Sequence, residues 1–242
     1  MTLPFHSRLT ALLIAAPLAA TMPALAQQPA SAPAASALTP AQITAFNKAV
    51  TDFTAGQTAQ QAGDNAGAVA KYEAALPAIR TVVQADPGKI DNVTFLANVL
   101  YADAAAQASL GKVDQAITLF GEAAPHWRKV VEAKPADAAS RNVLAGMLVQ
   151  LGNQKLSAKD APGADPYYQE ALALARKSVA ENAADKVNKN LLLSALIGAS
   201  QTGSDPAIKT EAVTLGRAMV ADGSIDPVNK PSIDAMTAQK AG

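Results

Sequence analysis

The chain has 242 residues, with 20 basic and 20 acidic side chains, and it contains no cysteine. A net charge near zero without a basic block argues against a nucleic acid or an anionic membrane as partner. The absence of cysteine excludes disulfides, thiolate metal sites and a cysteine nucleophile.

The first 26 residues predict an export signal. His6 and Arg8 precede an apolar run over 9–20, and Ala-Leu-Ala at 24–26 has the small-x-small form of a cleavage site. A membrane span needs roughly 20 apolar residues, and this run is interrupted earlier. We therefore expect cleavage after Ala26 and a periplasmic or secreted protein; an uncleaved anchor is the alternative.

A short spacer and then a long helical region follow the signal. Residues 27–38 are rich in Pro, Ala and Ser, which predicts a flexible linker. Thr39, Pro40 and Gln42 then have the order of a helix start with a capping box. We expect a helical repeat domain over 39–222 and a tail over 223–242 that contains a short capping helix.

Glycine and proline divide the repeat domain into four predicted helical hairpins. The outgoing helices are expected at about 40–62, 89–110, 136–157 and 187–201, and the returning helices end near 86, 134, 182 and 221. Pro77 and Pro125 fall inside the first two returning helices, where each removes a backbone hydrogen bond. We expect those two helices to bend there.

Many residues recur at a fixed step of 48 along the chain. The recurring alanines are Ala68, Ala116, Ala164 and Ala212; the aromatic residues are Tyr72, Phe120 and Tyr168; the arginines are Arg80, Arg128 and Arg176. Self-similarity at one period indicates stacked supersecondary units. Such solenoids usually present a surface to a partner.

The repeated residues resemble the tetratricopeptide repeat (TPR) family. The stretch Gly63-Asp64…Ala68…Tyr72…Ala75 follows the second half of its pattern, and Leu151-Gly152…Ala164…Tyr168…Ala171 follows both halves. The family period is about 34 residues, so both helices of each hairpin must be longer here. The resemblance implies an all-α solenoid of about four TPR-like hairpins with long helices.

The resemblance also implies a binding groove lined by the first helix of each hairpin. By register, one row is Phe53, Tyr101, Val149 and Ile197, and the next is Gln57, Ala105, Asn153 and Gln201. A groove of apolar and amide side chains suits an extended or helical peptide. The alternative is that the first row belongs to the core between the helices.

Three other groups of residues invite a functional interpretation. The recurring arginines have the chemistry of an anion-binding ladder, but a structural pairing with a carboxylate of the next hairpin explains their repetition more simply. His126 and Trp127 indicate packing more than chemistry. Asp86, Asp91 and Asp103 have no evident partner geometry, and no residue set predicts catalysis, a cofactor or a metal.

We therefore expect an exported, non-enzymatic scaffold that binds a protein or peptide partner. One alternative is a self-associating structural protein of the cell envelope, which would form a homo-oligomer. A second alternative is a small-ligand binder or enzyme with a pocket near His126, Trp127 and Arg128. The partner, the curvature of the solenoid and the oligomeric state are not predicted by the sequence.

Overall fold

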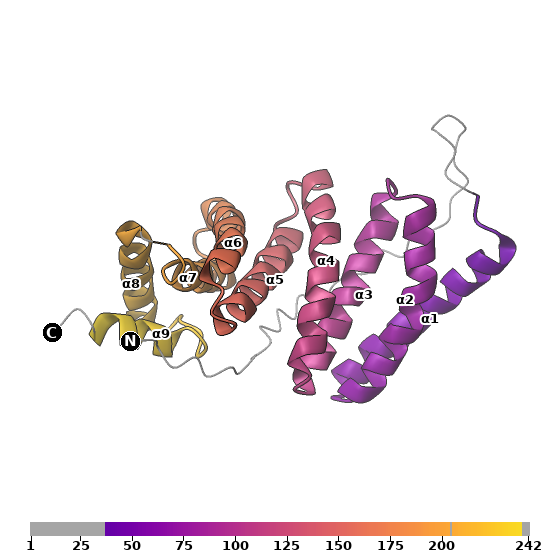
Figure 1. Cartoon of the computed structure of the whole chain (residues 1–242), viewed down its shortest axis with the longest axis horizontal. Helices are drawn as coiled ribbons and strands as arrows, with labels where there is room; N and C mark the ends of the chain where they lie inside the picture. Colours follow the sequence, from indigo (N-terminus) through magenta and orange to yellow (C-terminus); the bar gives the residue numbers. More distant parts are fainter. Residues whose placement is uncertain (1–36, 204, 239–242) are drawn as a thin grey trace. The chain divides into compact units, whose positions relative to one another are not determined.

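A computed structural model describes residues 37–203 and 205–238, and within these ranges the chain is all-helical, with no strand (Figure 1). The predicted signal peptide and most of the predicted linker lie outside the described residues. The described chain forms two compact units, which divide between Lys134 and Pro135. This division falls where the second predicted hairpin ends.

The first unit contains four consecutive helices. They are α1 (Pro40–Gln61), α2 (Asn65–Ala85), α3 (Ile90–Ser109) and α4 (Val113–Ala133). Each helix packs against the next one along the chain. The predicted capping box is confirmed, since the Thr39 side chain accepts from the Gln42 amide and the Gln42 side chain accepts from the Thr39 amide. Gly63 and Gly111 have positive φ and allow the tight turns after α1 and α3.

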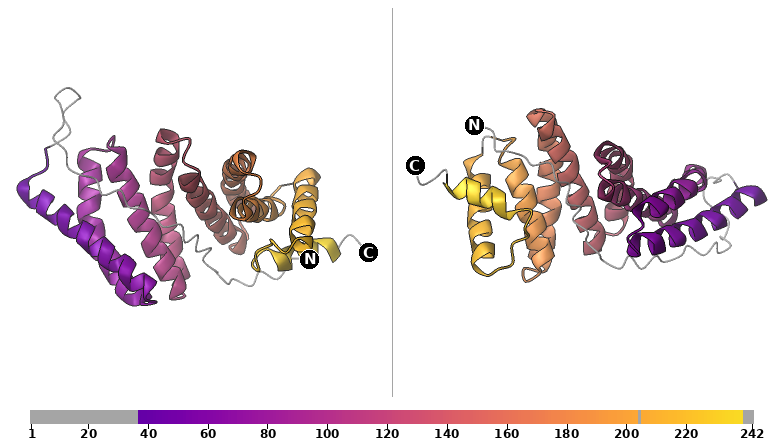
Figure 2. Two further views of the ribbon diagram at one scale, coloured as in Figure 1. Left: turned by 180° about the vertical axis from the view of Figure 1, so that it is seen from behind. Right: turned by 90° about the horizontal axis from the view of Figure 1, so that it is seen from below.

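The second unit contains the other five helices of the described chain. They are α5 (Ala138–Ser157), α6 (Ala161–Glu181), α7 (Lys186–Ala199), α8 (Pro206–Ala221) and α9 (Lys230–Ala238). Consecutive helices pack together, and α7 also contacts α5 (Figure 2). The predicted fourth hairpin, α7 and α8, is shorter than the others, as expected.

Pro77 and Pro125 lie inside α2 and α4, as the sequence predicted. Neither proline has an N–H group, so the carbonyls of Glu73 and Gly121, four residues earlier, lose their helical donors. Both helices nevertheless continue to their expected ends. The bends expected at these prolines stay a prediction.

A tyrosine packed against glycine closes a hairpin in each unit. Tyr72 and Tyr168 are fully buried. A Cβ placed on Gly56 would lie 2.5 Å from the Tyr72 ring, and one placed on Gly152 would lie 2.8 Å from the Tyr168 ring. Only a residue without a side chain lets the helices approach this closely around the ring. Each hydroxyl is also satisfied: Tyr72 donates to Gln60 at 2.9 Å.

A cluster of aromatic rings fills the space between α1, α2 and α3. Phe95 meets Phe46 and Phe53 edge-on, with ring centroids 5.8 Å and 5.3 Å apart. Phe53 also lies 5.7 Å from the Tyr72 ring. Edge-to-face pairs of this kind stabilise a core beyond the area that they bury.

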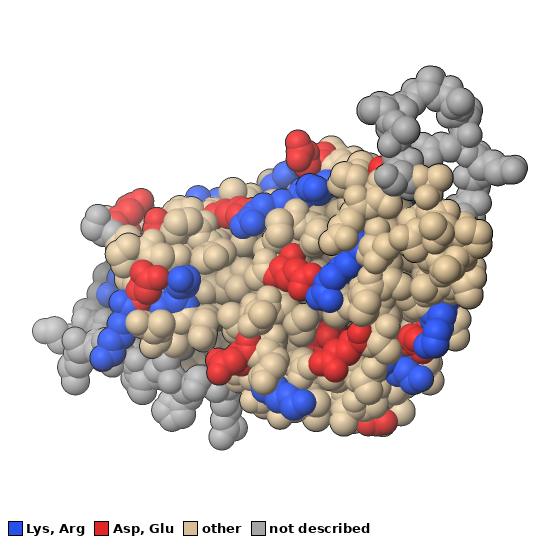
Figure 3. Space-filling model, turned by 45° about the vertical axis from the view of Figure 1, so that its right-hand side comes forward, with Lys and Arg blue, Asp and Glu red and all other residues tan. Residues whose placement is uncertain are grey.

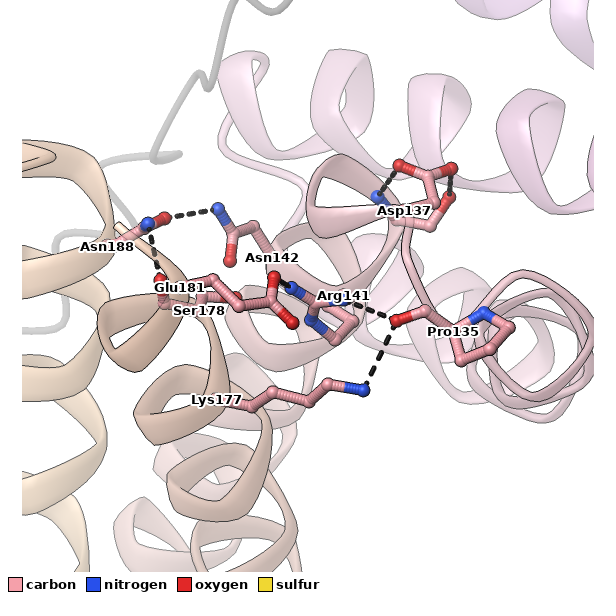
Figure 4. Close-up of polar contacts among 9 residues, drawn as sticks. Pro135, Asp137, Arg141, Asn142, Lys177, Ser178, Glu181 and Asn188 are labelled. Atoms are coloured by element: carbon pink, nitrogen blue, oxygen red, sulfur yellow. Dashed lines mark hydrogen bonds and ion pairs between the residues drawn. The ribbon is translucent and has the colours of Figure 1, made fainter. Parts of the chain in front are cut away.

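Buried polar side chains connect α5, α6 and α7 in the second unit (Figure 4). Arg141 is 1% exposed; it donates to the carbonyl of Pro135 at 2.6 Å and pairs with Glu181. Asn142 donates to the side chain of Asn188 at 2.7 Å, and Asn188 donates to a carbonyl of α6 at 3.0 Å. These hydrogen bonds compensate part of the groups' loss of water and join the three helices, although Arg141 Nε and Asn142 Oδ1 have no partner.

The tail is held against α7 by amide groups. The Asn190 side chain donates to the carbonyl of Ser224 at 2.8 Å and accepts from the Asp226 amide at 2.8 Å. On α9, Ile233 and Met236 are buried. The predicted short helix is therefore present and packs on α8.

Glycine substitutions in α5 test the tyrosine contact. Gly152→Ala should lower the free energy of unfolding by about 1–3 kcal/mol, because its Cβ would overlap the buried Tyr168 ring. Gly146→Ala is the matched control in the same helix: its Cβ would lie 3.9 Å from Leu191. The control should stabilise by roughly 0.5–1 kcal/mol. Urea denaturation followed by circular dichroism measures both, and equal effects would contradict the packing argument.

Candidate functional site

Two of the recurring arginines form ion pairs with the next hairpin. Arg80 on α2 binds Glu122 on α4 through two hydrogen bonds of 2.7 Å and 2.8 Å. Arg176 on α6 binds Glu211 on α8 at 2.6 Å. The structural pairing predicted from the repeat is confirmed for these two arginines, whose guanidinium groups are engaged by carboxylates.

The first predicted groove row lies mostly in the helix core. Phe53, Val149 and Ile197 are only 3%, 6% and 7% exposed. Phe53 packs in the aromatic cluster, which the sequence offered as the alternative for this row. Tyr101 is partly exposed, with its ring 5.9 Å from that of Phe120.

The second predicted row is half-buried, apart from Ala105, which is buried. Asn153 accepts a 2.6 Å hydrogen bond from the Tyr168 hydroxyl. Gln201 donates to the carbonyl of Ile197 at 3.1 Å, within its own helix end. Two residues of the predicted groove rows are therefore partly exposed and are not held by the hydrogen bonds described for Asn153 and Gln201. They are Gln57 and Tyr101, both in the first unit.

His126 and Trp127 differ in how far they are buried. Trp127 is 1% exposed and lies in the helix core. His126 is partly exposed, and its Nδ1 has no hydrogen-bond partner. Burial lowers the pKa of His126 below its ordinary value, which favours the neutral ring. The pair therefore contributes mainly to packing.

A polar cleft of about 490 Å³ opens between α2, α3 and α4. Its lining comprises Glu73, Leu76 and Arg80 from α2, Asp103 and Gln107 from α3, and Asp114, Gln115, Thr118 and Leu119 from α4. All of these residues belong to the first unit. The cleft is thus built within one set of helices that pack against one another.

Asp103 is the most unusual residue of this cleft. Its side chain is 1% exposed, and neither carboxylate oxygen has a hydrogen-bond partner. One turn further along α3, the Gln107 amide donates to Glu73 at 3.2 Å, while its Oε1 has no partner. Buried polar atoms are nearly always paired, so three unpaired acceptors at one place indicate a functional role.

Burial raises the pKa of Asp103 to about 6, because a carboxylate loses water there. The negative charge of Glu73 acts in the same direction. The opposing influences are the neighbouring amide of Gln107 and the positive charges of Arg80 and Lys112. A carboxylate poised to titrate in a cleft is typical of functional sites.

The sequence contained a signal for Asp103 that the prediction did not use. At the 48-residue step, its equivalents are Ala55, Leu151 and Ala199. The repeat therefore places a small or apolar residue at this position elsewhere, so helix stacking does not require a carboxylate. A charge that departs from its own repeat is a sign of local function.

The chemistry open to the cleft is that of hydrogen-bond and charge recognition. Among residues 37–203 and 205–238, no group of three or more His, Asp or Glu side chains lies as a metal site would require. In the same ranges no helix combines the length and the apolar character needed to cross a membrane. The unpaired acceptors of Asp103 and Gln107 would bind a donor group.

Comparison with known proteins adds no relative. No protein-family model matches the chain, and no curated protein matches it significantly.

The difference in stability between Asp103→Asn and the wild type should depend on pH. Because the folded-state pKa is raised from 3.8 to about 6, the stabilising protonated form is complete below pH 4 and is lost as the pH rises through 6. At pH 7.5, Asp103→Asn should therefore raise the free energy of unfolding by about 1–3 kcal/mol, measured by urea denaturation. At pH 4 the variant and the wild type should have nearly the same free energy of unfolding. The same difference at both values would exclude a raised pKa.

Proposed function

We propose that this protein is an exported, non-enzymatic interaction scaffold of the tetratricopeptide type, a solenoid of four helical hairpins. The observation that supports this most is the contact between a tyrosine and a glycine, which recurs in both units at the positions that the 48-residue step predicts. Tyr72 with Gly56 and Tyr168 with Gly152 form this contact. The proposal includes no cofactor and no metal.

The first helices of the hairpins would provide the partner-binding face. In the first unit, Gln57 on α1 and Tyr101 on α3 are the residues of the predicted rows with partly exposed side chains. Phe53, on α1, is buried in the core. A preformed helical surface costs a partner less entropy than one that must order on binding. An extended or helical peptide is the form of partner that suits it.

The charge distribution is compatible with a protein partner. On the face drawn in Figure 3, acidic and basic side chains alternate and neither sign gathers in a large patch. With 20 residues of each sign overall, steering of a highly charged polymer is not expected. Self-association in the cell envelope is the second candidate, since it needs no other partner.

A capture experiment tests the partner-binding face. The full chain is compared with Gln57→Ala/Tyr101→Ala, and with Tyr167→Ala as a control that removes a partly exposed aromatic residue outside the predicted rows. A partner retained by the full chain and the control, but lost by the double variant at unchanged helicity, is the expected result. Capture of the same proteins by all three, or of the chain alone, would exclude this face.

Export is tested by the mass of the protein recovered from expressing cells. We expect a periplasmic or secreted product that begins at Gln27, because the residues before it have the form of a cleavage site. Ala26→Leu replaces the small residue and should leave the chain uncleaved. A full-length wild-type product would favour the anchor instead.

A further inference from the structure

We propose that the cleft between α2, α3 and α4 binds an ammonium group, with the Asp103 carboxylate as its counter-ion. The group belongs to a free amine or to a lysine side chain of a partner. If the group is a lysine of a partner, the proposal rests on the proposed interaction function; if it is a free amine, it does not.

The number of unpaired acceptors fits an ammonium group. Both oxygens of Asp103 and the Oε1 of Gln107 are buried without a donor. The two residues are four positions apart on α3, so they lie on the same face of the helix. An ammonium carries three N–H donors and no acceptor, which matches three acceptors that lack a hydrogen.

The charge of the cleft favours a cation. Glu73, Asp103 and Asp114 contribute three carboxylates to the lining, while Arg80 is its basic residue among those described. Arg80 is already held by two hydrogen bonds to Glu122, a carboxylate outside the lining. Its charge is therefore largely compensated, and an incoming cation would meet a negative site.

The fold does not explain the buried carboxylate in another way. Burying a carboxylate is costly even with the positive charges of Arg80 and Lys112 nearby, and Ala55, Leu151 and Ala199 at the equivalent positions show that the repeat folds without it. A bound ammonium would remove this cost by supplying both the opposite charge and the missing donors. Asp103 would thus supply the anionic half of an ion pair with the ammonium group.

Calorimetric titration of the full chain tests the proposal with two probes. The first is n-butylammonium chloride; the second is a blocked alanine pentapeptide with a central lysine, compared with its norleucine counterpart. At pH 7.5 we expect a lysine or ammonium probe to bind, and Asp103→Asn to weaken binding at least about tenfold, since a charge-assisted hydrogen bond is lost. Asp91→Asn is the control: Asp91 lies on the same helix, outside the cleft, next to Lys134 at 3.6 Å.

A second measurement needs no variant. The carboxyl carbon of Asp103, followed by NMR, should titrate at lower pH when the bound probe is present, because a cation favours the charged carboxylate. For the same reason the affinity should fall as the pH drops below 6. Other charged groups around the cleft also act on this titration. They are Glu73, Arg80, Lys112, Asp114 and Glu122.

Each result leads to a decision. Binding of butylammonium that is lost in Asp103→Asn supports the site with a free amine as ligand, and binding of the lysine peptide alone supports a partner side chain. Equal binding by Asp103→Asn, or no binding of either probe with an unchanged Asp103 titration, overturns the proposal. A partner that is still captured through Gln57 and Tyr101 would then leave the interaction function standing.

Discussion

The close contact between a buried tyrosine ring and a glycine is the constraint on which the packing of both units depends. An alanine-rich chain buries little area per side chain, so its helices must approach closely to gain enough dispersion energy. Gly56 and Gly152 allow that approach around Tyr72 and Tyr168, and the alanines on either side of each tyrosine are fully buried. A larger residue at either glycine would force the hairpin apart along its length.

This close packing also creates the conditions for the polar cleft. α3 is buried along most of its length between its neighbours, so a side chain such as Asp103 has little access to water. Arg80 and Glu122 join the helices on either side of α3 through a partly exposed ion pair.

The 48-residue repeat predicts where the helices lie, but it does not predict which of their side chains are exposed. Glycine and proline mark chain reversals locally, so the helices were predictable, and the 48-residue step predicted the pairing of Arg80 with the next hairpin. Register alone does not say how much of a helix surface is covered, so Phe53 on α1 and Ile197 on α7 were assigned to a groove although they are buried. Asp103 departs from its own repeat in the sequence, but the missing hydrogen-bond partners of its carboxylate oxygens appear only in three dimensions.

Tyr168 differs from Tyr72 in a way that bears on cooperativity. Its ring lies against Gly152 of its own hairpin and also against Gly198 of α7, where a Cβ would lie 2.0 Å away. One side chain therefore closes the third hairpin and joins it to the next, so neither contact can be released alone. Such a shared ring links the opening of the helices that it contacts into one event. Amide protons of α5, α6 and α7 would accordingly exchange with solvent as a single group.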